Sequence, residues 1–232
     1  MFWQRWRSVQ ETTARKAKRA CALIVLCVGT TQVDSVDITE LQVFENSGVY
    51  HINVVTVIDA PAEYVHKVLT DYVHIYRLNP SITESQILPS TGNGAVRVRI
   101  RILDCIFIFC MELDWVEDVY ELPPYDLRTI IVPSLSNFQS GKTDWVIEPE
   151  GEHSQVIYEA KLEPDFVILP IIGPFLIKEK LRKKMVVSMA RIECFAKIQE
   201  ELDWSPHLQV ASVEIDTLCG EKCDADTGQC PQ

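Results

Sequence analysis

The chain has 232 residues, 47% of them hydrophobic, so it is long and apolar enough to form one domain with a substantial core and is not a disordered chain. Its formal net charge is -11, and six of its 22 basic residues fall within residues 1–20 beside a single acidic residue. The remainder is strongly acidic, which argues against nucleic acid as a partner because phosphate backbones are repelled by an acidic surface.

The first 31 residues have the order of a targeting segment. A basic stretch ends at Arg19, and the apolar run Ala20–Val28 follows it. This run is shorter than the roughly 20 residues that a membrane-spanning helix needs. We expect residues 1–31 to be a signal peptide or an N-terminal anchor and the protein to be exported, to the periplasm or as a secreted protein. The alternative is a buried or frayed N-terminal helix in a cytoplasmic protein.

Next come a strand and two short helices. Residues 32–47 are mixed and polar, as in a linker or an edge strand. Residues 49–58 are β-branched and apolar, which predicts a strand. Pro61 suits the first turn of a helix, and a second short helix is predicted over 72–78. The first helix has one apolar face, formed by Ala62, Val65, Val68 and Leu69.

A long series of strands follows the helices. The predicted strands cover residues 82–88, 95–103, 105–119, 126–132, 142–148 and 155–162. Within 95–103 aliphatic residues alternate with Arg97, Arg99 and Arg101, which predicts one buried face and one solvated face. Asp104 is expected to mark a turn, and residues 133–141 a loop.

One long helix closes the domain. Pro170 and Pro174 flank its start, and the helical pattern continues to about Leu202. A helix of about 28 residues is about 40 Å long, enough to cross a whole sheet. Its predicted inward stripe is Leu181, Met185, Ser188, Ile192 and Phe195.

The cysteines divide into two groups. Cys105, Cys110 and Cys194 lie in apolar or helical segments and are interpreted as small buried residues. Three others, Cys219, Cys223 and Cys230, lie in the polar tail of residues 204–232. We expect two of these three to pair in a disulfide. Free or intermolecular thiols and a metal site are the alternatives, and no histidine lies close to these cysteines to complete a zinc site. We therefore predict no metal and no cofactor.

Three stretches of this order resemble a known family. They are Val54–Val65 (VVTVIDAPAEYV), Asp71–Ile82 (DYVHIYRLNPSI) and Tyr158–Pro164 (YEAKLEP), the last leading into the closing helix. The chain resembles the START-like, or SRPBCC, superfamily over about residues 48–200. The most similar group is the polyketide cyclase/dehydrase and lipid transport family, including its coenzyme Q-binding COQ10-like members. The resemblance implies an α+β helix-grip fold over residues 48–203, with a curved antiparallel sheet of about six or seven strands wrapped around a long C-terminal helix.

The resemblance also implies an apolar cavity between the sheet and the helix, which binds and transports a hydrophobic small molecule such as a lipid, quinone, sterol or polyketide. Residues of a suitable type to line it are Phe107, Phe109, Trp115, Tyr158, Met185, Met189, Phe195 and Arg128. The same residues would fill a solid core if no cavity existed.

A membrane-contact surface is a further hypothesis. Ile171, Ile172 and Phe175 belong to a very apolar segment, and Lys183 and Lys184 follow it closely. Apolar residues beside a basic cluster favour transient contact with an anionic membrane during ligand loading. The alternative is that the apolar segment packs under the sheet while the lysines are solvated.

The sequence favours a binding protein over an enzyme. Its five histidines are scattered, and no nucleophile–base pairing is evident. One alternative is a cyclase or dehydratase that uses Tyr158 and Arg128 as acid–base groups. The other is a protein-interaction module.

Overall fold

A computed structural model describes residues 36–89, 92, 94–106, 109–166, 168, 172–204 and 219, all within one compact unit that spans residues 35–231. The strands are β1 (Asp37–Asn46), β2 (Val49–Ile58), β3 (Ile82–Leu88), β4 (Val96–Ile106), β5 (Phe109–Leu122), β6 (Asp126–Ile131), β7 (Phe138–Glu150) and β8 (His153–Pro164). The helices are α2 (Ala62–Leu69) and α3 (Ile172–Trp204), with short 3-10 helices η1 (Ile75–Leu78) and η2 (Pro133–Leu135).

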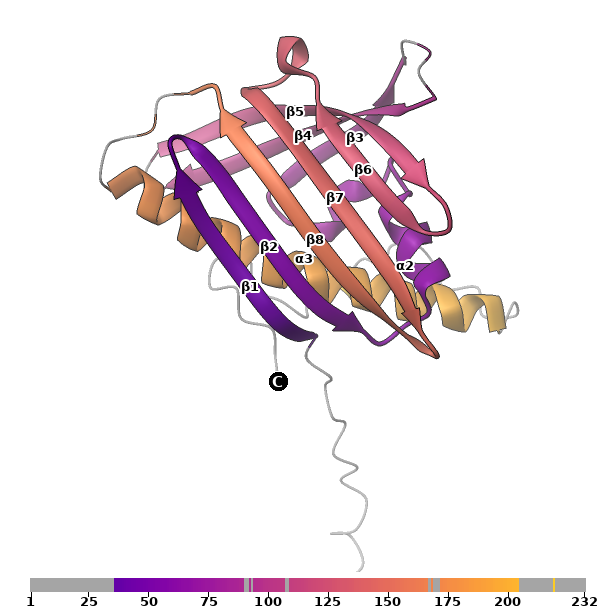
Figure 1. The fold of residues 1–232 in the computed structure, drawn as a ribbon. Helices are drawn as coiled ribbons and strands as arrows, with labels where there is room; N and C mark the ends of the chain where they lie inside the picture. Colours follow the sequence, from indigo (N-terminus) through magenta and orange to yellow (C-terminus); the bar gives the residue numbers. More distant parts are fainter. Residues whose placement is uncertain are drawn as a thin grey trace, which may run out of the picture. The chain divides into compact units, whose positions relative to one another are not determined.

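The eight strands form one curved antiparallel sheet. Their order is β1-β2-β8-β7-β6-β5-β4-β3, so β1 and β3 are the edges. Figure 1 shows α3 lying across one face of the sheet, with α2 beside it. This is the expected α+β helix-grip fold.

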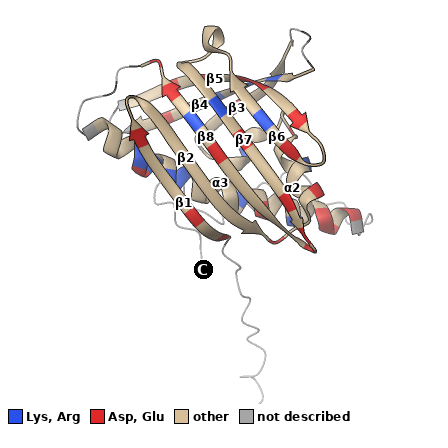
Figure 2. Ribbon diagram, in the orientation of Figure 1, with Lys and Arg blue, Asp and Glu red and all other residues tan. Residues whose placement is uncertain are grey.

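Residue alternation separates the two faces of the sheet. Every second residue of β2, from Tyr50 to Ile58, is buried, and on β4 Val98 is fully buried between half-buried neighbours. On the other face the Nε of Arg97 lies 2.7 Å from Oδ1 of Asp118 on β5. Figure 2 shows acidic and basic residues side by side on β6, β7 and β8 as well, where Arg128 pairs with Asp144. The predicted buried and solvated faces are therefore confirmed, since the charged side chains pair with one another along the outer face.

The closing helix packs closely against only part of the molecule. Of the predicted stripe, Met185, Ile192 and Phe195 are buried, and Leu181 and Ser188 are half-buried. The close packing of α3 is against α2, η1, β1 and β2. The strands in the middle of the sheet face α3 across a wider space.

Residues 37–46 form the edge strand β1, paired with β2, which is one of the two predicted alternatives and fits their polar character. The sheet thus has eight strands instead of about six or seven. Three predicted boundaries differ from the structure. Asp104 does not mark a turn, since β4 continues to Ile106 and Asp104 pairs with Met111 of β5. β7 begins at Phe138, inside the expected loop 133–141. The helix predicted over 72–78 is limited to the 3-10 turn η1.

The interpretation of Cys105 and Cys110 as small buried residues was wrong, whereas Cys194 is buried as expected. Cys105 and Cys110 lie opposite each other on β4 and β5, are exposed, and form a disulfide.

A second disulfide joins Cys194 of α3 to Cys219 of the tail. The prediction that two tail cysteines pair with each other was wrong for Cys219, whose partner lies 25 residues earlier in the chain. Cys219 is fully buried and belongs to the hydrophobic core. Cys223 and Cys230 lie outside the described residues.

The Cys194–Cys219 disulfide should contribute substantially to stability. Closing a loop of this length removes about 3 kcal/mol of unfolded-state entropy. We expect Cys219→Ala to lower the free energy of unfolding by about 3 kcal/mol, measured by urea denaturation without reductant. Cys110→Ala is the matched control. The disulfide that it removes joins residues only five apart in the sequence. Cys110→Ala should therefore lower the free energy of unfolding by about 1 kcal/mol less than Cys219→Ala does. Equal stability of Cys219→Ala and the wild type would contradict this role.

Candidate functional site

A cavity of about 1040 Å³ lies between the inner face of the sheet and residues 173–192 of α3. Its wall is mostly apolar and includes Ile52, Ile100, Leu113, Leu127, Leu162 and Leu181. This volume is at the upper end of the roughly 300–1,000 Å³ range of small-molecule sites. The cavity is the structure's clearest candidate for a functional site.

Several residues that the sequence singled out lie in the cavity wall. Trp115 on β5, Tyr158 on β8 and Met185 on α3 all line it. Met189 and Phe195 are instead buried in the packed core, where α3 meets the rest of the fold. Ligand contact by any of these residues remains a prediction.

Two phenylalanines and one arginine of the predicted set lie elsewhere. Phe107 and the side chain of Phe109 are outside the described part of the structure. Arg128 is half-exposed on the outer face of β6, and its Nε lies 2.6 Å from Oδ1 of Asp144. Its neighbours Leu127 and Thr129 line the cavity, so Arg128 points to the opposite side of the strand.

The cavity wall contains a buried glutamate, held by two hydrogen bonds, that the sequence patterns did not single out. Glu117 of β5 is only 8% exposed. Its Oε2 accepts hydrogen bonds from Nε1–H of Trp115, at 2.8 Å, and from the hydroxyl of Thr129, at 2.7 Å. The signal was present in the sequence, because Leu113, Trp115, Glu117 and Val119 occupy alternate, inward positions of one strand.

The surroundings of Glu117 favour its neutral form. Burial raises the pKa of the Glu117 carboxyl, although the hydrogen bonds from Thr129 and Trp115 oppose this. Burial also raises the pKa of the Tyr158 phenol, and negative charge at Glu117 would raise it further. Both shifts favour the protonated, uncharged form of these two groups.

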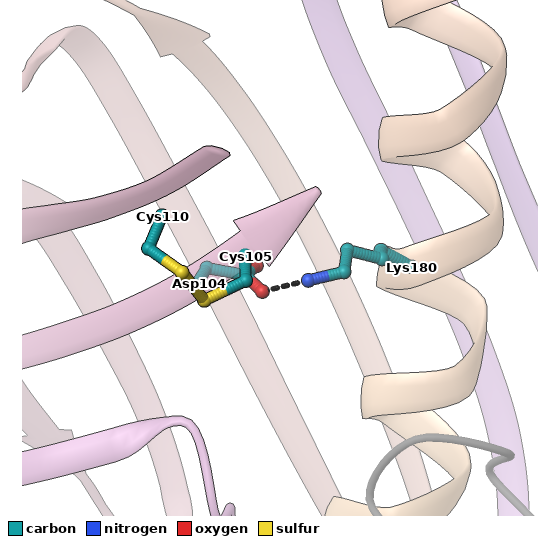
Figure 3. Close-up of a disulfide and its surroundings, with 4 residues drawn as sticks. All are labelled: Asp104, Cys105, Cys110 and Lys180. Carbon is teal, nitrogen blue, oxygen red and sulfur yellow. Dashed lines mark hydrogen bonds and ion pairs between the residues drawn. A yellow bond between two sulfur atoms is a disulfide. The ribbon is translucent and has the colours of Figure 1, made fainter. Parts of the chain in front are cut away.

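Charged groups lie at another part of the wall, where β4 approaches α3. Asp104 accepts hydrogen bonds from Lys180 and from Lys184, the latter with Nζ 2.6 Å from Oδ2. Figure 3 shows Asp104 pointing toward Lys180 beside the Cys105–Cys110 disulfide. These three charged residues all line the cavity.

Burial and ion pairing shift the pKa values of Asp104 and Lys184. Although burial acts to raise the pKa of Asp104, the charges and hydrogen bonds of Lys184 and Lys180 hold it below its ordinary value. Burial lowers the pKa of Lys184, and Asp104 opposes that shift. The ion pairs thus fasten the β4–β5 hairpin to the start of α3.

The predicted membrane-contact residues occupy different environments. Phe175 on the first turns of α3 is 60% exposed, and Lys183 is also exposed. Lys184 instead lies in the cavity wall with Asp104. Ile171 and the side chain of Ile172 are outside the described residues.

No metal centre is formed by the part of the chain that the structure describes, which has no group of three or more His, Cys, Asp or Glu side chains able to hold an ion. The described residues also include no helix long and apolar enough to cross a bilayer. The side chains that line the cavity offer apolar contact and hydrogen bonding to a ligand.

Solved structures share this fold at low sequence identity. The Zhui aromatase/cyclase from Streptomyces sp. R1128 is 15% identical with a TM-score of 0.55, and the match covers 70% of this chain and 99% of that one. The STAR-related lipid transfer protein from Xanthomonas axonopodis is 14% identical with a TM-score of 0.54, covering 71% and 99%. A third protein, TTHA0849 from Thermus thermophilus, is 19% identical with a TM-score of 0.50, covering 64% and 98%. These likenesses establish the fold alone.

The sequence itself matches one family over more than half of its length. No curated protein matches the chain significantly. The family described as polyketide cyclase / dehydrase and lipid transport matches residues 58–188, from the end of β2 into the middle of α3. This span includes β4 to β8 and most of the cavity wall. The chain belongs to the polyketide cyclase/dehydrase and lipid transport family.

Proposed function

We propose that this protein binds a hydrophobic small molecule in the cavity between the sheet and α3, and carries it. The observation that carries the proposal is the size of the cavity together with its mostly apolar wall. The names of two structural neighbours, a lipid transfer protein and an aromatase/cyclase, agree with a ligand of this class. Lipids, quinones, sterols and polyketides all belong to it, and the narrower COQ10-like resemblance would favour a quinone.

Burial alone can supply the affinity. A ligand that removes roughly 400 Å² of apolar surface from water gains about 10 kcal/mol. Association costs at least about 4 kcal/mol in lost freedom of motion. The remainder, about 6 kcal/mol, corresponds to a dissociation constant on the order of tens of micromolar before any polar contact is made.

The enzymatic alternative has less support. It relied on Tyr158 and Arg128 acting together, but Tyr158 lines the cavity and Arg128 lies on the outer face beside Asp144. An acid–base pair must share one substrate, and these two side chains are on opposite faces of the sheet.

Filling the cavity should abolish ligand binding. We expect Ile102→Trp, on the inner face of β4, to lower the affinity for the apolar dye Nile red at least tenfold, because the indole would occupy the ligand's space. Native mass spectrometry of the purified protein should likewise show less co-purifying apolar material. Leu103→Trp is the matched control, since Leu103 is 45% exposed on the next position of the same strand. Equal dye binding by both variants and the wild type would rule out the cavity as the site.

We also propose that the start of α3 contacts a membrane while the ligand is exchanged. Phe175 is exposed, and its neighbours Gly173, Leu176 and Ile177 line the cavity. An apolar side chain placed here would enter the lipid next to a route for the ligand. Lys183 on the same helix would add attraction to anionic lipid.

Phe175→Ser should weaken binding to vesicles of phosphatidylcholine and phosphatidylserine at least fivefold, since a phenylalanine gains roughly 1.5–3 kcal/mol on full burial. Lys183→Glu should weaken binding only when phosphatidylserine is present. Ile87→Ser is the control. It removes another exposed apolar side chain, 52% exposed on edge strand β3, and should leave vesicle binding unchanged. Vesicle sedimentation measures all three, and unchanged binding of Phe175→Ser would refute the contact.

Export is the third part of the proposal. The two disulfides are typical of proteins that fold in an oxidising compartment. The basic-then-apolar order of residues 1–31 supports the same conclusion. We expect the protein to be recovered from the periplasm or medium of expressing cells, and mass spectrometry of its N-terminus would show whether residues 1–31 have been removed. Recovery from the cytoplasm with reduced cysteines would contradict export.

A further inference from the structure

Glu117 is placed as a polar group within an otherwise apolar part of the cavity. Its side chain is buried, and Val119, Leu127 and Leu113 line the cavity on β5 and β6 around it. Trp115 and Thr129 both donate to the same carboxyl oxygen, Oε2. Among the described residues, no hydrogen bond is formed by the other oxygen, Oε1. One side of the carboxyl group is therefore fixed by the protein and the other is available to a ligand.

No described basic side chain forms an ion pair with Glu117. The lysines of the cavity wall, Lys180 and Lys184, are paired with Asp104. The titratable groups coupled to Glu117 are the phenols of Tyr72 and Tyr158, which carry no positive charge. The Tyr72 hydroxyl in turn donates to Glu121 at 2.8 Å.

This arrangement determines where the carboxyl proton lies. A buried carboxylate without a counter-charge costs several kcal/mol, so the group retains its proton. The Trp115 indole can only donate, and together with Thr129 it occupies the acceptor positions of Oε2. The proton therefore belongs on Oε1, which becomes a hydrogen-bond donor toward the cavity.

We propose that Glu117 is the polar subsite of the cavity and donates a hydrogen bond through Oε1 to an uncharged oxygen of the ligand. The oxygen would be a ketone, quinone or ester carbonyl, or a hydroxyl, on an otherwise apolar molecule. This inference rests on the proposed function and narrows its ligand class. An anionic head group is disfavoured at this position, because it would be buried without a cation to pair with.

Two substitutions separate the roles of shape and of the donated proton. Glu117→Gln keeps the shape, and because its carbonyl oxygen must accept from Trp115 and Thr129, its NH₂ group would donate toward the cavity. Glu117→Leu keeps much of the volume but removes the donor. Affinities are measured by displacement of Nile red with 2-tridecanone, tridecane and dodecanoate, which have similar chain lengths.

The decisive quantity is the ratio of the dissociation constants for tridecane and 2-tridecanone. Relative to wild type, we expect Glu117→Leu to shift this ratio about tenfold against the ketone, the size of one hydrogen bond. Glu117→Gln should leave it within about twofold, and dodecanoate should bind the wild type more weakly than the ketone. An unchanged ratio in Glu117→Leu, or a loss in Glu117→Gln equal to that in Glu117→Leu, would overturn the inference.

Failure of the proposed function and failure of the Glu117 inference give different displacement results. If neither tridecane nor the ketone displaces the dye from the wild type, the proposed function fails. If both bind and the ratio is the same in every variant, the cavity binds ligands but Glu117 is not its polar subsite.

A ligand-free measurement tests the protonation state separately. The unfolded chain loses the Glu117 proton near the ordinary pKa of 4.5, whereas the folded protein retains it to higher pH. As pH rises above 4.5, the wild type should therefore lose stability relative to Glu117→Gln. The infrared band of protonated carboxyl groups should also persist to higher pH in the wild type than in Glu117→Gln. A pH-independent stability difference, with the same band in both proteins, would show an ionised carboxylate and contradict the inference.

Discussion

A single helix cannot cover the inner face of an eight-stranded curved sheet. α3 packs closely against α2, η1, β1 and β2, on one side of the fold. The cavity is nevertheless lined by residues of β4 to β8, and many of them are apolar. The second helix, α2, packs closely against only β7 and β8 of these strands, so the inner side chains that neither helix covers face water or a ligand. The cavity is a consequence of this mismatch between one helix and a wide sheet.

Interactions of two kinds hold α3 in place along the cavity, a disulfide and ion pairs. At one end of α3, Cys194 is bonded to Cys219 within the hydrophobic core. Near the other end, Lys180 and Lys184 reach Asp104 at the tip of β4, next to the Cys105–Cys110 disulfide (Figure 3). A void of about 1040 Å³ loses the packing contacts that a solid core would provide. Covalent bonds and ion pairs at its ends offset part of that loss without filling the space.

Sequence patterns predicted those parts of the fold that depend on neighbouring residues. The alternation of Val96 to Ile102 with three arginines marked both faces of β4, and the stripe around Met185 marked the buried side of α3. Features that depend on distant residues were missed. The pairing of Cys194 with Cys219 has no local signature, and Asp104 resembled a turn residue until its lysine partners on α3 were known. Arg128 is a different case: it was assigned to the cavity by residue type, although the local alternation with Leu127 and Thr129 points it outward.

Glu117 interrupts the apolar pattern of the cavity wall, and this polar position says more about the ligand than the apolar residues do. Leucine at this position would satisfy the needs of the fold, and its burial would be favourable rather than costly. Trp115 and Thr129 orient the carboxyl group of Glu117 without supplying a positive charge. Apolar residues such as Leu113 and Leu127 fit any hydrophobic ligand equally well, so they provide affinity without selectivity. A single oriented donor in such a wall discriminates among ligands by the position of one oxygen atom, because any ligand without that oxygen leaves a buried polar group unpaired.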